Sequence, residues 1–152
     1  MKYFVIIFIL FSLDQISKNL IINSIPLNET FFVNSFLNIV FIYNKGFLFG
    51  YLSDLPDTVL FYTHLLLLFF STYIIYKFLF LQIEHRGISL LFFAGALGNS
   101  FDRLFRNGVV DFIDFHYYGI HWPAFNLADS FIFIGVIIYL IKYIWSENCL
   151  QE

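Results

Sequence analysis

The chain has 152 residues, of which 60% are apolar and 12% are charged, and its mean hydropathy is +0.79. A water-soluble domain of this size has too little interior to bury so much apolar surface, so the composition indicates an integral membrane protein. The formal charge of −3 argues against nucleic acid as a partner, because phosphate binding needs a basic surface.

Four apolar stretches have about the length of 20 residues that a membrane-spanning helix needs. They cover residues 3–22, 58–80, 88–105 and 127–145. We therefore predict that residues 1–152 form one membrane domain, an all-α protein with four transmembrane helices. Four spans place both termini on the same side of the membrane. The Lys and Arg residues outside polar motifs favour the cytoplasm for that side.

The first span carries a polar stripe. Asp14, Gln15, Lys18 and Asn19 are spaced so that they share one face of a helix. Placing an ionisable group inside a bilayer costs free energy unless the group is paired or in contact with water, so each one suggests a function. Two interpretations remain open: an Asp14–Lys18 pair whose lysine snorkels to the interface, or an Asp14 that faces the bundle interior and organises other polar groups.

The connection after the first span has a different amino-acid composition from the spans. Residues 36–43 (FLNIVFIY) are rich in β-branched and aromatic side chains and predict a strand at the membrane surface. The sequence Asn44-Lys45-Gly46 then predicts a turn. Residues 106–125, between the last two spans, are predicted to form a loop.

The third span combines small and polar residues. Ala94, Gly95 and Gly98 would let a neighbouring helix approach closely. The polar residues at the end of this span share one face of the helix, and they are Asn99, Asp102, Arg103 and Arg106. They form either a structural polar clamp or part of a functional site.

Two further acids lie in and just after the last connection. Asp111 lies within residues 106–125, and Asp129 follows Asn126 at the start of the fourth span, where Asn126 and Asp129 can also serve as helix caps. Two close carboxylates share a proton, so one can act as base and the other as acid, activating water without a metal. His116 and His121 match no familiar zinc spacing, and we predict no metal and no cofactor.

Five short motifs follow one another along nearly the whole chain. They are residues 14–18 (DQISK), 44–50 (NKGFLFG), 95–103 (GALGNSFDR), 109–112 (VVDF) and 125–129 (FNLAD). This ordered set resembles the lipoprotein signal peptidases (signal peptidase II) of bacteria. The resemblance implies four membrane helices, a small extracytoplasmic β element between helices 1 and 2, and an active site toward the outer face of the bacterial cytoplasmic (inner) membrane.

The resemblance also implies a chemistry. It indicates an aspartic endopeptidase, surrounded by membrane lipids, that removes the signal peptide from diacylglyceryl-modified prolipoproteins by cleaving just before the lipidated cysteine. By their places in the motifs, Asp111 and Asp129 match the catalytic pair. The residues that match substrate-binding or supporting positions are Asp14, Asn44, Gly46, Asn99, Asp102, Arg103 and Asn126.

The chain departs from the family pattern at two places. Phe47 and Leu48 are bulky where the family usually has small residues, and Ala94 stands where a glycine is usual. The bulk at Phe47 would narrow a substrate groove and so affect signal-peptide preference.

Two alternative functions use the same polar residues differently. A small ion- or proton-coupled transporter would use membrane carboxylates as a relay, but its polar groups would lie near the midplane, often in repeated halves. Here the acids cluster toward one face and the chain has no internal repeat. A non-catalytic membrane subunit would use them only to pack helices.

Overall fold

The computed structural model describes residues 2–45, 86–106 and 108–148, together with isolated positions between 56 and 77. Its long helices are α1 (Lys2–Ser24), α3 (Arg86–Phe105) and α4 (Leu127–Asn148). They coincide with the predicted spans 3–22, 88–105 and 127–145, and each extends slightly beyond its prediction. The predicted span 58–80 lies largely outside the described residues, so the fourth helix stays a prediction.

Two of these helices have the properties of membrane spans. Within the described residues, α1 and Leu127–Trp145 of α4 are long and apolar enough to cross a membrane. Only 17% and 11% of their apolar windows are buried inside the protein, so they are not the core helices of a soluble domain. Helix α3 has a similar length, but Asn99, Asp102 and Arg103 make it more polar, and it packs against both α1 and α4.

Small residues allow this packing. A Cβ atom at Gly95 would overlap the carbonyl oxygen of Ala128 in α4, and one at Gly98 would overlap the carboxylate of Asp14 in α1. Ala94 is fully buried beside them. The predicted close approach of neighbouring helices along this face of α3 is therefore confirmed.

The protein also contains a four-stranded antiparallel sheet, so it is not all-α. The strands are β1 (Thr30–Asn34), β2 (Leu37–Asn44), β3 (Val109–Tyr117) and β4 (Ile120–His121), in the order β1-β2-β3-β4. The predicted strand at 36–43 is confirmed as β2. The predicted turn was wrong at Asn44, which ends β2, and Gly46 lies outside the described residues.

The loop prediction for residues 106–125 was also wrong. These residues contain β3 and β4, so the sheet draws on two connections and not only on the one between helices 1 and 2. Residues Val109 to Phe112 are all buried, which removes the polar and apolar alternation that normally marks a strand. A strand that is covered on both faces cannot be recognised by its period.

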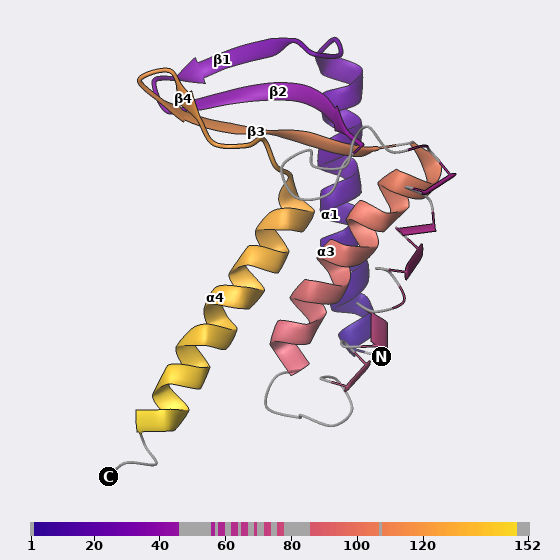
Figure 1. Ribbon diagram of the computed structural model, residues 1–152, viewed down its shortest axis with the longest axis vertical. Coiled ribbons are helices and arrows are strands. Elements are labelled where there is room, and N and C mark those ends of the chain that lie inside the picture. Colours follow the sequence, from indigo (N-terminus) through magenta and orange to yellow (C-terminus); the bar gives the residue numbers. More distant parts are fainter. Residues whose placement is uncertain are drawn as a thin grey trace.

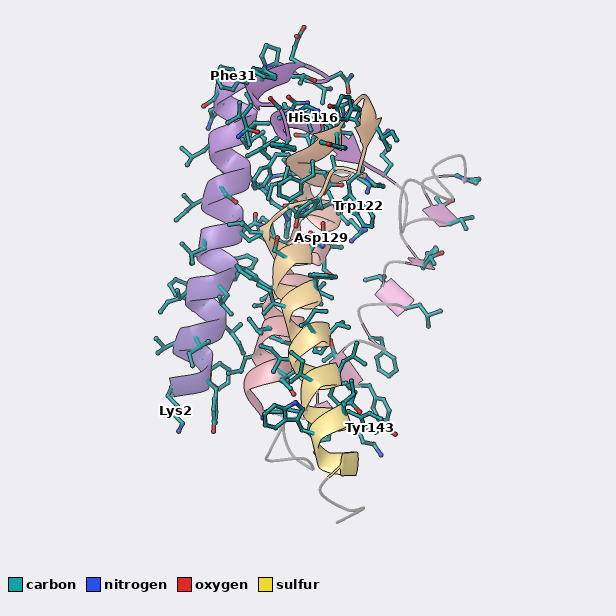
Figure 2. The ribbon with its side chains drawn as sticks, turned by 90° about the vertical axis from the view of Figure 1, so that its left-hand side faces the viewer. Lys2, Phe31, His116, Trp122, Asp129 and Tyr143 are labelled. Atoms are coloured by element: carbon teal, nitrogen blue, oxygen red, sulfur yellow. The ribbon has the colours of Figure 1, made fainter. Side chains whose placement is uncertain are left out.

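The sheet lies across one end of the helices, where α1 and α3 end and α4 begins (Figure 1). Figure 2 shows Phe31 and His116 at this end, and Lys2 and Tyr143 at the opposite end. Asp129 lies between them, in the first turn of α4 just below the sheet. The junction of sheet and helices therefore collects side chains from both.

Candidate active site

The backbone brings together Asp111 of β3 and Asp129 of α4. The carbonyl oxygen of Phe125 accepts hydrogen bonds from the N–H groups of both Phe112 (3.0 Å) and Ile113 (2.8 Å). Two successive donors on one acceptor mark a β-bulge, which re-aims side chains. This bulge in β3 fixes the start of α4 beside the strand that carries Asp111.

Asn126 connects the two carboxylates directly. Its Nδ2 donates to Oδ1 of Asp111 at 2.7 Å, and its backbone N–H donates to Oδ2 of Asp129 at 3.2 Å. The N–H of Asp129 returns a bond to Oδ1 of Asn126 at 3.0 Å. The last two bonds form a capping box, so the capping interpretation is confirmed. The bond to Asp111 goes beyond capping.

Two more amides complete the shell around the pair. Asn44 donates from Nδ2 to Oδ2 of Asp111 at 3.0 Å, and Asn99 donates from Nδ2 to Oδ1 of Asp129 at 2.7 Å. Each oxygen of both carboxylates thus accepts at least one N–H donor. The Arg103 guanidinium also interacts electrostatically with both acids.

The pKa of Asp111 is raised from the ordinary value of 3.8 to about 7. Burial is the largest cause, since only 3% of this residue is exposed, and the negative charge of Asp129 is the second. Hydrogen bonds from Asn44 and Asn126 act in the opposite sense but are outweighed. Near neutral pH, Asp111 can therefore carry a proton beside Asp129, which is half-buried. This is the arrangement that acid–base chemistry on water needs.

A buried ion network lies beneath the pair, between α1 and α3. The Lys18 ammonium is 2.9 Å from Oδ2 of Asp14 and 2.8 Å from Oδ2 of Asp102, and all three side chains are fully buried. Gln15 donates from Nε2 to both carboxylates, at 3.0 and 3.2 Å. The Asp14–Lys18 pair of the first interpretation is therefore confirmed, but the snorkelling of Lys18 was wrong, because its charge is compensated inside the bundle.

The network also holds the backbone next to each acid of the pair. Oδ1 of Asp14 accepts the N–H of Ala128 at 2.9 Å, one residue before Asp129. Oδ2 of Asp102 accepts the N–H of Val110 at 3.2 Å, one residue before Asp111. Asp14 thus faces the bundle interior and organises groups from other elements, as the second interpretation of the stripe predicted.

Comparisons with known proteins agree with this arrangement. The family model described as signal peptidase (SPase) II matches residues 6–145. A lipoprotein signal peptidase of Aquifex aeolicus is 40% identical over 148 residues, which cover 93% of this chain and 85% of the relative. One of Thermodesulfovibrio yellowstonii is 38% identical over 136 residues, which cover 90% of each chain.

The chain belongs to the signal peptidase II family. Its fold is also similar to a solved bacterial membrane enzyme, with a TM-score of 0.78 and 33% identity, covering 96% of this chain and 89% of that one. A second solved bacterial membrane enzyme gives a TM-score of 0.75 at 34% identity, covering 93% and 92%. The protein is therefore a peptidase of lipoprotein processing, and the geometry above belongs to a member of that family.

Most of the predicted site residues of this signal peptidase lie at the junction of sheet and helices. In direct contact with one another are Asn44, Asn99, Asp111, Asn126 and Asp129. Asp14 and Asp102 lie one layer below, in the network around Lys18. Gly46, Phe47 and Leu48 fall outside the described residues.

Sequence reasoning missed two groups. Lys18 and Gln15 were seen in the polar stripe but were not predicted as parts of the site, because their partner Asp102 lies on another helix. A second cluster, Asn38, Asp114 and His121, lies farther along the sheet. Asn38 is a polar residue inside the apolar strand 36–43 and was one sequence signal for this cluster.

Proposed function

We infer that this chain is a membrane aspartyl endopeptidase that removes signal peptides from diacylglyceryl-modified prolipoproteins. The observation that carries the proposal is the coupled pair of Asp111 and Asp129. One asparagine bridges the two carboxylates, and the charge of Asp129 helps to raise the pKa of Asp111 to about 7. A pair that holds one proton near neutral pH has both an acid and a base available at once.

The roles of the two acids follow from their surroundings. The raised pKa of Asp111 places the shared proton on that residue, so Asp129 is the group that takes a proton from the attacking water. Asp111, with its raised pKa, gives its proton to the carbonyl oxygen of the scissile peptide. When the tetrahedral intermediate collapses, the C–N bond breaks, the nitrogen takes the proton from Asp129, and the hydroxyl returns its proton to Asp111.

The proposed setting is the bacterial cytoplasmic membrane. We place residues 58–80 as a fourth span, both termini in the cytoplasm and the catalytic pair toward the outer face. Three observations support this topology: α1 and α4 are apolar enough to cross, Lys2 and Tyr143 lie at one end, and Asp129 lies near the other. A cysteine that carries diacylglycerol would be held at that outer surface by its own lipid.

The lipid mainly positions the substrate. Each CH₂ group that leaves water contributes about 0.8 kcal/mol, but an acyl chain already in the bilayer has gained that energy before it meets the enzyme. Contacts with the protein therefore select the geometry of the bond before the cysteine more than they add affinity. We place this bond across Asp111 and Asp129.

Incubation of the detergent-purified protein with two forms of one precursor tests the proposal. We expect cleavage of the diacylglyceryl-modified precursor just before its lipidated cysteine, and no cleavage of the unmodified form. Mass spectrometry of both products locates the cut. Equal cleavage of both forms would contradict the substrate assignment, and no cleavage of either would favour a non-catalytic subunit.

A further inference from the structure

Lys18 contacts a third group besides its two carboxylates. Its ammonium donates to Oδ1 of Asn99 at 3.1 Å, in addition to the ion pairs with Asp14 and Asp102. An ammonium has three N–H donors and no acceptor, so these three partners use its whole hydrogen-bonding capacity. Asn99 in turn donates to Asp129. Lys18 is therefore one side chain away from the catalytic pair.

The orientation of Asn99 depends on what surrounds it. The two ends of a carboxamide have nearly the same shape, but the oxygen only accepts hydrogen bonds and the nitrogen only donates them. Lys18 and Nδ2 of Asn126 both present donors to the Asn99 oxygen, at 3.1 and 3.2 Å. The Nδ2 of Asn126 has two N–H groups and also donates to Asp111, at 2.7 Å, so both donors hold the Asn99 oxygen and Lys18 is the charged one, which makes the stronger bond.

The orientation of the Asn99 amide decides whether a hydrogen-bond donor or an acceptor faces Asp129. In the structure, the Asn99 nitrogen faces Oδ1 of Asp129 at 2.7 Å and donates to it. If the amide turned over, its oxygen would face a carboxylate oxygen, and only a proton on Asp129 would relieve the repulsion between the two acceptors. An Asp129 that carries a proton cannot take one from water.

We propose that Lys18 is a positioning residue of the catalytic pair, which holds the Asn99 amide so that its nitrogen faces Asp129. This keeps Asp129 as the proton acceptor and leaves Asp111 as the proton donor. The proposal rests on the proposed aspartyl mechanism and gives the buried cation a role beyond neutralising Asp14 and Asp102.

A double-mutant cycle between Lys18→Met and Asn99→Ala tests the proposal. Methionine keeps the length and bulk of the side chain but donates no hydrogen bond. We expect Lys18→Met to lower kcat for the lipidated precursor about 100-fold, with KM within about threefold of wild type. In an Asn99→Ala background the same change should lower kcat by less than about threefold, because the amide through which Lys18 acts is gone.

The pH dependence gives a second readout that a structural role would not change. With Asn99 free to turn, an oxygen can face Asp129 in place of an N–H donor, so the acidic limb of the kcat profile should move to higher pH in Lys18→Met. Equal loss of kcat in both backgrounds, together with an unmoved limb, would overturn the proposal.

Arg106→Gln is the matched control. Arg106 belongs to the same network, where it pairs with Asp102 and donates to Gln15 (3.0 Å) and Asn19 (2.8 Å), but no hydrogen bond joins it to Asn99. We expect this variant to melt at a lower temperature and to keep kcat within about threefold of wild type. A loss of kcat as large as that of Lys18→Met would show that any damage to the network has the same effect, and would also overturn the proposal.

Folding and mechanism can be separated in the same assay. If Lys18→Met does not accumulate in membranes, the cycle is measured in an Asp14→Asn background, which removes one charge of each sign and leaves Asp102 paired with Arg106. If Asp129→Asn cleaves the precursor at the wild-type rate, the proposed function itself is wrong. If Asp129→Asn is inactive but the cycle is additive, the proposed function stands and the role of Lys18 is refuted.

Discussion

Two aspartates on the same strand have pKa shifts in opposite directions. Asp111 and Asp114 both lie on β3, with exposures of 3% and 6%. Each accepts a hydrogen bond from an asparagine of the neighbouring strand β2, from Asn44 at 3.0 Å and from Asn38 at 2.9 Å. The two carboxyl groups are therefore alike in their burial and in their asparagine partner from β2.

The other groups around each carboxyl explain why the two pKa shifts differ in direction. Beside Asp111 lies another acid, Asp129, and burial together with that charge raises the pKa of Asp111 to about 7. Burial also acts to raise the pKa of Asp114, but hydrogen bonds from Asn38 and His121 and the charges of His121 and His116 outweigh it, so the net shift is downward. The charges and hydrogen-bond donors around a buried carboxyl group thus decide the direction in which its pKa shifts.

Exchange of each acid for its amide should have the largest effect on precursor cleavage. We expect Asp111→Asn and Asp129→Asn to lower cleavage of the lipidated precursor by at least about 1000-fold, because each removes a proton-transfer group. Asp114→Asn, the matched control on the same strand, should keep cleavage within about fivefold. The different roles of the two acids on β3 would be contradicted if Asp114→Asn is as inactive as Asp111→Asn in membranes that contain equal amounts of protein.

The pH dependence of cleavage follows from the raised pKa of Asp111. The acid loses its proton as the pH rises through about 7, so kcat should fall about tenfold per unit at higher pH. A series of kcat measurements from acidic to alkaline pH in one detergent checks this. A rate that stays constant well above neutrality would mean that no group with this pKa acts as the acid.

The raised pKa also makes Asp111 a cost to stability. The folded protein holds this proton more tightly than the unfolded chain, whose carboxyl has the ordinary value of 3.8, so stability falls as the pH rises from about 4 to about 7. Between about pH 5 and pH 8 the loss is about 2 to 3 kcal/mol. Thermal melting of Asp111→Asn should lack this loss, and parallel curves for variant and wild type would contradict it.

His121→Ala should have the smallest effect. Its ring nitrogen lies 2.9 Å from Asp114, but the side chain is 54% exposed, so the pair contributes at most about 1 kcal/mol. The ion pair exists only when the imidazole is protonated, and Asp114 has a lowered pKa, so the effect should be larger near pH 5 than near pH 8. We expect a slightly lower melting temperature at pH 5, less change at pH 8, and cleavage within about twofold of wild type. A larger loss of stability at pH 8 than at pH 5 would exclude the ion pair as the cause.

Much of the architecture could be predicted from local patterns. Apolar runs located α1, α3 and α4, since length and hydropathy are properties of the segment itself. The strand at 36–43 was visible through its β-branched and aromatic residues. Strand β3 was not, because four consecutive buried residues from Val109 to Phe112 do not alternate.

The site was predictable as a set of residues and not as a geometry. The motifs named the acids and amides, but the order of contacts depends on the bulge at Phe112 and Ile113 and on a register shift between β2 and β3. The burial of Lys18 depends on Asp102, which is 84 positions away in the chain. Local spacing reveals only its partner one turn away, Asp14.

In the proposed mechanism, Asp111 and Asp129 form one unit that shares a proton. Infrared titration of the purified protein measures this directly, through the C=O stretch of a protonated carboxyl group. We predict a band that disappears near pH 7, that is absent in Asp111→Asn, and that titrates at lower pH in Asp129→Asn because the neighbouring charge is gone. A band that titrates at the same pH with and without the Asp129 carboxylate would contradict the account.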